Sequence, residues 1–552
     1  MNMASETMNL LMNPIFVGTK FIQEKINKLF EGKPAWQIVL LSCGTTIMVI
    51  KLHDLLESEE HLTLRIKRTL FKILRKVPAV QQKIDKSLKE TAQQINESIK
   101  HSINSEPYVQ VVPEKGFSSE DVMKEVERYR AYGVVDWKKG WCSGMIYGSN
   151  EELTKLLAKV YEIFAFSNPL HPEVFPDIRK MEAEIVRMTC NLFNGSSASC
   201  GIVTTGGTES IMLACLAYRN RAYSKGIKIP EIIAPKTAHA AFDKAAMVLR
   251  MRLTHIPVDP VTKKVDVNAM KRAINKNTCL LVGSAPQFPH GIIDPIAEIS
   301  ELGLKYNIPV HCDCCLGGFL VPFLEKAGFH MDPVDFRLPG VTSISADTHK
   351  YGQAPKGSAV LMYKDPNYRK FQWFSITNWP GGIYATPTFA GSRAGSEIAS
   401  CWATMMFTGM EGYVDAAWKI ISTARAMAKV LKNIHSIEVL GDPKMSVIAF
   451  TSKEFDIYRL SDALTAKGWT LNPLQFPASI HMCVTLAHTK PEVVERFEKD
   501  VAESVEVILQ NPSEKCQGAG ALYGMSQTIP DRSIVEDVTG IYLDASYDTT
   551  NH

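Results

Sequence analysis

The sequence lacks most of the features that would place a chain in a specialised class. Its 552 residues carry a formal net charge of only +3, which is too weak a field to argue for nucleic-acid binding. Its twelve cysteines are scattered and no secretory signal peptide is recognisable at the start, so we expect reduced thiols in a reducing compartment. There is neither an internal repeat nor a low-complexity tract. A composition of 45% hydrophobic and 22% charged residues is that of a globular protein, and the length predicts at least two domains.

A metal site of the zinc-finger type is also missing from the pattern. His311, Cys312, Cys314 and Cys315 lie close together, but no second pair of ligands follows at zinc-finger spacing. Small buried residues at the end of a strand explain this cluster better. We therefore predict no bound metal.

Charge is absent from the run 34–50, which is roughly 17 residues long, the lower limit for crossing a bilayer. Trp36 lies near one end, where an interfacial indole belongs, and Lys33 and Lys51 flank the run. We predict a single transmembrane helix, while composition leaves open a short buried or interfacial helix. Basic residues are denser after the run than before it, which predicts that the rest of the chain faces the cytosol.

The stretch that follows the uncharged run is charged and compatible with a helix, and we interpret 56–110 as a basic helical stalk. Its basic part, 65–89, either lies along an anionic lipid surface or forms a solvated helical face. A helix predicted at 118–130, with Ser118 as its cap, leads into the main globular region. The predicted segment boundaries are 1–55, 56–110, 111–160, 161–395, 396–510 and 511–552.

The segment 161–395 alternates between helical stretches and short apolar runs rich in β-branched residues. Helices are predicted at 153–166 and 176–193, and strands at 201–204, 232–234, 254–257, 280–283, 308–312 and 342–346. Strands separated by helices predict an α/β fold, a mainly parallel sheet between helices. The segment 396–510 predicts a smaller α+β domain, and 511–552 looks irregular.

The most informative stretch is Ser-Ala-Asp-Thr-His-Lys-Tyr-Gly at 345–352. Lys350 directly follows His349 between two strand-like runs, and Asp313 ends another apolar run upstream. A lysine that can form an imine and a carboxylate that can keep a pyridinium nitrogen protonated are the pair that pyridoxal 5'-phosphate chemistry requires. An isolated His-Lys pair would indicate only a surface loop, so the hypothesis depends on the other parts of a cofactor site.

Those other parts occur in order along the chain. Gly206, Gly207 and Thr208 follow a strand-like run and open a helix, where backbone amides and the helix dipole favour a phosphate. The hydroxyls of Thr208 and Ser210 could add donors. His239 follows the strand at 232–234, where an imidazole can either stack on a pyridine ring or cap the next helix. Asp313 itself has the alternative of a helix N-cap.

With this order in place, the chain resembles the fold-type I pyridoxal-phosphate enzymes related to group II amino-acid decarboxylases. Further motifs are similar to those of the sphingosine-1-phosphate lyase family. They are Phe-Ser-Asn-Pro-Leu-His-Pro at 166–172, Pro-Gln-Phe-Pro-His-Gly at 286–291, Ser-Ala-Asp-Thr-His-Lys-Tyr-Gly-Gln-Ala-Pro-Lys-Gly at 345–357 and Phe-Ala-Gly-Ser-Arg at 389–393. The resemblance covers about 110–530, and the N-terminal apolar run also fits it. Cys314 and Glu397 depart from the family pattern.

The resemblance implies a role for each matching residue. Lys350 would form the imine with the cofactor, Asp313 would pair with the ring nitrogen, and His239 would stack on the ring. The cofactor phosphate would be held by Gly206, Gly207, Thr208 and His349, with Gly391 and Ser392 contributed by the partner subunit of a homodimer. The polar head of the substrate would be surrounded by Tyr147, Asn168, His171, Lys356 and Tyr384. Tyr147, Tyr384 and Lys350 would be the candidates for proton transfer.

The activity implied by the resemblance is a lyase reaction on a phosphorylated long-chain base. The bond between carbons two and three of the base would break, giving a long-chain aldehyde and phosphoethanolamine. A pyridoxal-phosphate amino-acid decarboxylase is the alternative, because the same lysine, aspartate and histidine serve both reactions. The resemblance also implies the endoplasmic reticulum membrane as the location, with membrane lipid around the N-terminal helix.

Overall fold

The computed structural model describes residues 25, 27–28, 30–56, 70, 74–133, 135–148, 150–516 and 533–550. The chain divides into two compact units, Met1–Gln81 and Gln82–His552. Each unit is described by itself below. The predicted segment boundaries are finer than this division, and they stay predictions.

In the first unit, the uncharged run falls within helix α2 (Ala35–Leu56). Several of its large apolar side chains are exposed, among them Trp36, Leu40, Ile47 and Met48. Within the described ranges, no helix combines the length and the apolarity needed to cross a membrane. The middle of α2, Ser-Cys-Gly-Thr-Thr at 42–46, is small or polar, which lowers its hydropathy. The predicted transmembrane helix is therefore not confirmed.

The second unit is built on a seven-stranded sheet in the order β1-β7-β6-β5-β4-β2-β3. Its strands are β1 (Cys200–Thr204), β2 (Glu231–Pro235), β3 (Arg252–Ile256), β4 (Thr278–Ser284), β5 (Val310–Cys314), β6 (Val341–Ala346) and β7 (Ala359–Tyr363). Only β7, among these strands, pairs antiparallel with its neighbours β1 and β6. The prediction of a mainly parallel sheet is confirmed.

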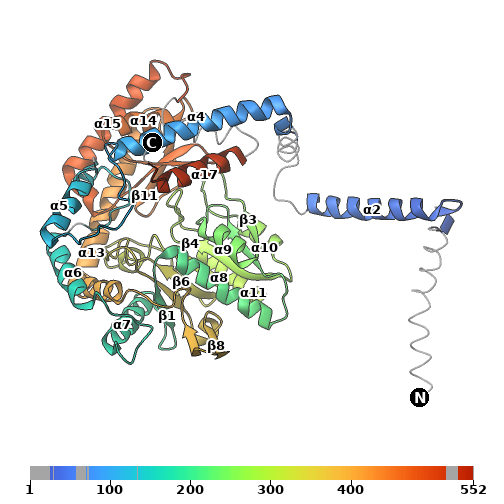
Figure 1. The fold of residues 1–552 in the computed structure, drawn as a ribbon, viewed down its shortest axis with the longest axis horizontal. Coiled ribbons are helices and arrows are strands. Elements are labelled where there is room, and N and C mark those ends of the chain that lie inside the picture. Colours follow the sequence, from blue (N-terminus) through green and yellow to red (C-terminus); the bar gives the residue numbers. More distant parts are fainter. Residues whose placement is uncertain are drawn as a thin grey trace. The chain divides into compact units, whose positions relative to one another are not determined.

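Helices cover both faces of this sheet, because successive side chains of each strand point to opposite sides. Ile202, Ile232 and Leu280 pack with α8 (Gly207–Ser224) and α9 (Ala241–Leu249) in one core cluster. Val203 and Leu281 belong to the other cluster, with α7 (Pro176–Leu192) and α11 (Ile296–Tyr306). Figure 1 shows these helices packed around the sheet. Burial is continuous along β1, β2, β4, β5, β6 and β7, as expected for strands covered on both faces. β5 and β6 nevertheless also bury polar side chains, including His311, Asp313 and Ser345.

The smaller predicted α+β region is present after the long helix α13 (Gly395–Asn433), which bends at Gly409, where φ is +60°. A four-stranded antiparallel sheet has the order β10-β11-β13-β12. Its strands are β10 (Glu438–Val439), β11 (Val447–Thr451), β12 (Asn472–Leu474) and β13 (Ser479–Cys483), with helices α14 (Ile457–Ala466) and α15 (Pro491–Leu509). Trp469, Phe450 and Phe497 are fully buried there, so this region has a core of large aromatic side chains.

Of the remaining helices, the first three fall on segments that were predicted to be helical, and the last two were not predicted. They are α4 (Pro78–Ser102), α5 (Ser119–Arg130), α6 (Glu151–Phe164), α10 (Val267–Ala273) and α12 (Pro366–Arg369). Ser118 accepts a hydrogen bond from the amide of Asp121 and caps α5 as expected. The helical prediction for the stalk is confirmed at 78–102, while 57–69 and 71–73 lie outside the described residues.

Two sequence interpretations need correction. The segment 511–552 is not wholly irregular, because α17 (Ser533–Tyr547) is a helix. Ile534, Val538 and Ile541 recur at helical spacing there, whereas 517–532, which holds the glycines that suggested irregularity, lies outside the described residues. A hairpin of β8 (Phe374–Trp379) and β9 (Gly382–Thr386) was also missed. Both of its strands are largely exposed, so burial gave them no apolar signature.

Candidate active site

The chemistry-bearing residues gather where neighbouring strands end. β5 and β6 run parallel, with Cys314 paired to Ala346, so Asp313 near the end of β5 and Asp347 just after β6 lie at the same edge of the sheet. The loop Gly206–Gly207 leaves β1 and opens α8. Ligand sites of open α/β sheets lie at the carboxyl ends of the strands, and this edge is therefore the place for a bound cofactor.

Lys350 points into this edge, and only 22% of its side chain is exposed. Its Nζ lies 2.9 Å from Oδ2 of Asp347, a carboxylate that is 2% exposed. Burial disfavours the charged amine, but the carboxylate outweighs this effect and raises the pKa of Lys350.

The loop that opens α8 lies against the same group of residues. The imidazole of His349 faces Gly206, where an added Cβ would lie 3.5 Å from Cε1 of the ring. A Cβ on Gly207 would lie 2.9 Å from both carboxylate oxygens of Asp347 and 2.8 Å from the sulfur of Cys315. Thr208 is exposed at the start of the helix. Ser210 is instead buried and bonded to Thr204, with the two hydroxyl oxygens 2.7 Å apart, so it is no candidate phosphate donor.

Asp313 is 6% exposed and is fixed by its neighbours. Its Oδ1 accepts hydrogen bonds from the amide of Cys315 at 3.0 Å and from the hydroxyl of Ser345 at 3.3 Å. Ser345 also lies 3.1 Å from Nε2 of His311. The alternative of a helix N-cap is not realised, because residues 315–320 form turns and no helix begins there. The carboxylate is held in one orientation at the strand end, as a partner for a ring nitrogen needs.

His239 is exposed at the end of β2. Its Nδ1 accepts a hydrogen bond from the amide of Ala241 at 3.1 Å, so the alternative of a histidine that caps the next helix is realised in this chain. Its ring also meets Phe288 edge-on, with the ring centroids 6.5 Å apart. The hydrogen bond restrains the orientation of the exposed imidazole.

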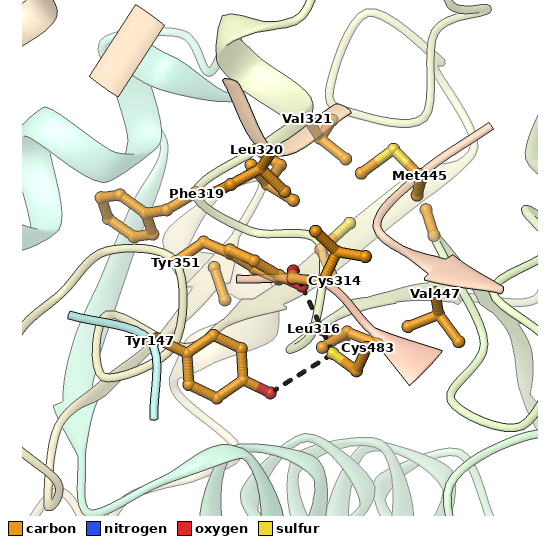
Figure 2. Close-up of a cluster of buried hydrophobic side chains, with 14 of the residues drawn as sticks. Tyr147, Cys314, Leu316, Phe319, Leu320, Val321, Tyr351, Met445, Val447 and Cys483 are labelled. Carbon is orange, nitrogen blue, oxygen red and sulfur yellow. Dashed lines mark hydrogen bonds between the residues drawn. The ribbon is translucent and has the colours of Figure 1, made fainter. Parts of the chain in front are cut away.

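Lys356 and Tyr147 lie on the other side of Lys350. Nζ of Lys356 is 5.0 Å from the ring centroid of Tyr147 and 3.5 Å from the carbonyl oxygen of His349. Burial and the charge of Lys350 lower the pKa of Lys356. The hydroxyl of Tyr147 faces Cys483, 3.9 Å from its sulfur, within the buried cluster of Figure 2. Burial raises the pKa of Tyr147 well above its usual value, so its hydroxyl keeps its proton.

The other predicted residues form a second group around the loop 389–393. Asn168 donates to the hydroxyl of Ser392 at 3.1 Å, and the hydroxyl of Tyr384 lies against Gly391, 2.4 Å from the place of an added Cβ. His171 is exposed, with Glu173 as its neighbour at 3.5 Å. No hydrogen bond, ion pair or ring contact among the described residues joins this group to the residues around Lys350.

Sequence reasoning missed two residues of the site. Asp347 lies three positions before Lys350, inside the stretch that was singled out, and a turn of that spacing brings both side chains to one side. Tyr351 was also given no role, although its hydroxyl donates to the carbonyl of Val484 at 2.8 Å and lies 2.6 Å from the hydroxyl oxygen of Ser446. The spacing between Asp347 and Lys350 could have been recognised in the sequence. The partners of Tyr351 are distant in sequence, so its contacts could not be predicted.

The residues present fit pyridoxal phosphate. Lys350 is an enclosed amine, Asp313 is an oriented carboxylate on the adjacent strand end, and Gly206 and Gly207 leave the helix N-terminus open for a phosphate. Oδ1 of Asp347 is buried without a hydrogen-bond partner, which indicates that a polar ligand completes this environment. These features together define a pyridoxal-phosphate enzyme of fold-type I.

Comparison with known proteins places the chain within that class. Residues 104–453 match the family model described as the pyridoxal-dependent decarboxylase conserved domain. Sphingosine-1-phosphate lyase 1 of Rattus norvegicus is 50% identical over 515 residues, which cover 93% of this chain and 90% of the rat protein. Sphingosine-1-phosphate lyase of Drosophila melanogaster is 47% identical over 531 residues, covering 96% of this chain and 97% of the fly protein. The chain belongs to the sphingosine-1-phosphate lyase family.

Solved structures agree with this assignment. The sphingosine-1-phosphate lyase of Burkholderia pseudomallei superposes with a TM-score of 0.71 and 41% identity, covering 72% of this chain and 93% of that one. A glutamate decarboxylase of Lactobacillus brevis has a TM-score of 0.63 at 22% identity, covering 73% of this chain and 96% of its own. The second likeness shows the shared fold alone.

Proposed function

We propose that the chain is a pyridoxal-phosphate-dependent lyase that cleaves sphingosine 1-phosphate and related long-chain base phosphates into a long-chain aldehyde and phosphoethanolamine. The observation that supports this most is the meeting of Lys350, Asp347 and Gly207, which brings the reactive amine to the phosphate-binding end of α8. Similarity to lyases of that name over more than nine-tenths of the chain gives the substrate class.

The cofactor, when bound, supplies an aldehyde for the substrate amine and a ring that accepts the electron pair from the broken carbon–carbon bond. Asp313 would hold the ring nitrogen, with its carboxylate kept in place by Cys315 and Ser345. His239 would lie over the ring. Gly206, Gly207, Thr208 and His349 would hold the cofactor phosphate.

The polar head of the substrate meets the cationic side of the site. Lys356 places a second amine near Lys350. The contact of the Lys356 amine with the ring of Tyr147 limits the orientations of the Lys356 side chain. Tyr147, Tyr384 and the amine of Lys350 are the groups proposed for proton transfer. Because burial keeps the Tyr147 hydroxyl protonated, Tyr147 is suited to donate a hydrogen bond and not to take up a proton.

A direct assay separates this proposal from amino-acid decarboxylation, which the family model's description makes the alternative. The purified chain loaded with cofactor is incubated with sphingosine 1-phosphate and, separately, with a panel of amino acids. We expect a long-chain aldehyde and phosphoethanolamine from the first and no carbon dioxide from the second. Carbon dioxide without aldehyde would establish the decarboxylase instead.

We also propose that the active unit is a homodimer in which Gly391 and Ser392 complete the site of the partner. Among the described residues, no hydrogen bond or ion pair joins their group to Lys350 of the same chain, as this arrangement requires. Inactive Lys350→Ala protein would be mixed with inactive Gly391→Asp protein and allowed to exchange subunits. Return of activity is the expected result, because mixed dimers contain one intact site. Failure to complement despite proven exchange would show that Gly391 and Lys350 of the same subunit belong to one site.

Attachment to the endoplasmic reticulum membrane through the run 34–50, with the catalytic unit in the cytosol, completes the proposal. The exposed apolar side chains of α2 support attachment, and a membrane-held enzyme would meet an amphiphilic substrate at its source. Replacing Leu40 and Met48 with Glu should release the chain from membranes. Extraction of wild-type membranes at alkaline pH distinguishes the two kinds of attachment. A single-pass helix stays in the membrane pellet, whereas an interfacial helix is released.

A further inference from the structure

Asp347 is the one charged group of the site whose position the proposed reaction leaves unexplained. It follows β6 directly, is 2% exposed, and points its carboxylate at the first residue of α8. Both oxygens lie 2.9 Å from the place of an added Cβ on Gly207. The absence of a side chain at Gly207 thus makes the space that the carboxylate occupies.

The carboxylate has one partnered and one unpartnered oxygen. Oδ2 lies 2.9 Å from Nζ of Lys350 and 3.7 Å from Nε2 of His349. Oδ1 is buried without a partner. His349 is not the main partner, because its Nδ1 donates to the carbonyl oxygen of Ser358 at 2.6 Å and burial lowers its pKa, which leaves Nε2 unprotonated. The ammonium group of Lys350 is therefore the cation that balances Asp347.

We propose that Asp347 is a positioning residue that acts through Lys350: in the cofactor-free protein it holds the amine as an ammonium ion against the Gly206–Gly207 loop, so that covalent attachment of the cofactor requires this contact to open. The inference rests on the proposed function in taking Lys350 as the cofactor lysine. It assigns to Asp347 control over when that lysine reacts.

The chemistry of attachment shows why such control matters. An ammonium ion is no nucleophile. Lys350 must first release one proton to solvent, after which its nitrogen forms a bond to the aldehyde carbon and the aldehyde oxygen leaves as water. A buried opposite charge at 2.9 Å favours the ammonium form, and so it opposes the first of these steps until the contact opens.

The other titratable groups around Asp347 and Lys350 do not reverse this preference for the ammonium form. The charge of Lys350 lowers the pKa of Lys356, while the carboxylate of Asp313 on β5 favours the ammonium form of Lys350. Burial raises the pKa of Cys315, which stays a neutral thiol. Tyr147 and Cys483 also face the pair, and burial keeps both protonated. Asp347 is the nearest of these groups to Lys350 and the one in contact with its amine.

The pKa values of Lys350 and Lys356 are shifted in opposite directions. This difference can be tested in the unaltered protein. Cofactor is removed from the full chain, and the lysines are methylated with formaldehyde and a borane reductant over a range of pH, with each site quantified by mass spectrometry. We expect Lys356 to react at lower pH than Lys350. Reaction of Lys350 before Lys356 would overturn the proposal even if no variant folds.

The variant Asp347→Asn tests the contact directly, because it keeps the shape and removes the charge. We expect the midpoint of Lys350 methylation to fall by at least one pH unit, which is roughly a tenfold gain in rate on its rising limb. Asp335→Asn is the matched control, since Asp335 is equally buried but pairs with Arg337, and it should leave the Lys350 profile unchanged. An unaltered profile in Asp347→Asn would overturn the proposal.

Identifying the residue that carries the cofactor distinguishes failure of the role of Asp347 from failure of the proposed function. Borohydride reduction of the loaded wild-type chain fixes the adduct for mass spectrometry. An adduct on Lys350 together with an unchanged profile in Asp347→Asn rejects the role of Asp347 alone. An adduct on another residue rejects the assignment of Lys350 and the inference with it.

Discussion

Arg393 and Glu182 form a two-point ion pair in which Nη1 lies 2.6 Å from Oε1 and Nη2 lies 2.9 Å from Oε2. Only 11% and 12% of the two side chains are exposed. Nη1 also donates to the carbonyl oxygen of Val203 at 3.3 Å, in β1 just before the Gly206 loop. This pair therefore ties the 389–393 loop to α7 and to the strand that leads into the Gly206–Gly207 turn.

Arg393→Met should destabilise the protein by about 3 kcal/mol, because it leaves the carboxylate of Glu182 buried without its partner. Thermal unfolding of the cofactor-loaded chain measures the effect as a lower midpoint. Lys419→Met is the control, since Lys419 pairs with Asp415 on an exposed face and its loss should change stability by less than about 1 kcal/mol. Equal midpoints for Arg393→Met and the control would contradict the structural role of the pair.

Lys350→Ala should abolish both turnover and the covalent attachment of the cofactor, because no other amine occupies its place beside Asp347. Mass spectrometry after borohydride reduction should find the pyridoxyl adduct on Lys350 in the wild-type chain and none in the variant. Lys364→Ala serves as the control, since Lys364 caps the carbonyl of Pro339 away from the site. A retained adduct in Lys350→Ala would show that the lysine is misassigned.

Gly207→Ala should weaken cofactor binding by about tenfold, equivalent to ~1.4 kcal/mol. The added methyl group would lie 2.8 Å from the sulfur of Cys315 and 2.9 Å from the oxygens of Asp347, so the loop or the carboxylate must move. Titration of the cofactor-free chain with pyridoxal phosphate, followed by absorbance, gives the affinity. Gly116→Ala, which meets no atom within 4 Å, should bind as the wild type does; matching affinities in the two variants would refute the crowding.

Stability should fall as the pH drops below about 6.5. Burial lowers the pKa of His290, His311, His481 and His488 to about 4. The unfolded chain binds protons near the ordinary value of 6.5, and the folded chain does not until about pH 4. Each of these histidines therefore destabilises the fold by about 1.4 kcal/mol for every pH unit across that window.

Thermal midpoints between pH 7.5 and 5.0 measure this slope, above the range where ordinary carboxylates titrate. His481→Gln should give a shallower fall than the wild type, although its midpoint at pH 7.5 is lower through lost packing. His330→Gln should keep the wild-type slope, because His330 is 91% exposed. An unchanged slope in His481→Gln would show that His481 is not the neutral buried group that its surroundings require.

The order of strands and helices could be predicted because both faces of the large sheet are covered. β2 and β4 read as apolar runs, and helical periodicity separates them. The β8–β9 hairpin and α17 were missed for different reasons. The hairpin strands are exposed and mixed in composition, whereas the helix lies beside a glycine-rich stretch. The transmembrane prediction for 34–50 rested on the absence of charge, and the polar centre of α2 reduced its apolarity.

The sequence by itself determined that the candidate residues lie near one another, because Lys350, Asp313 and the Gly206–Gly207 turn each follow a strand-like run, and strands in one sheet end at a common edge. Only the tertiary structure decided what surrounds them. The contact of Asp347 with Lys350, the capping of α9 by His239 and the burial of the Tyr147 hydroxyl beside Cys483 depend on which segments pack together. Such contacts set the charge of an amine or a phenol through burial and neighbouring charge, and neither is visible along the chain.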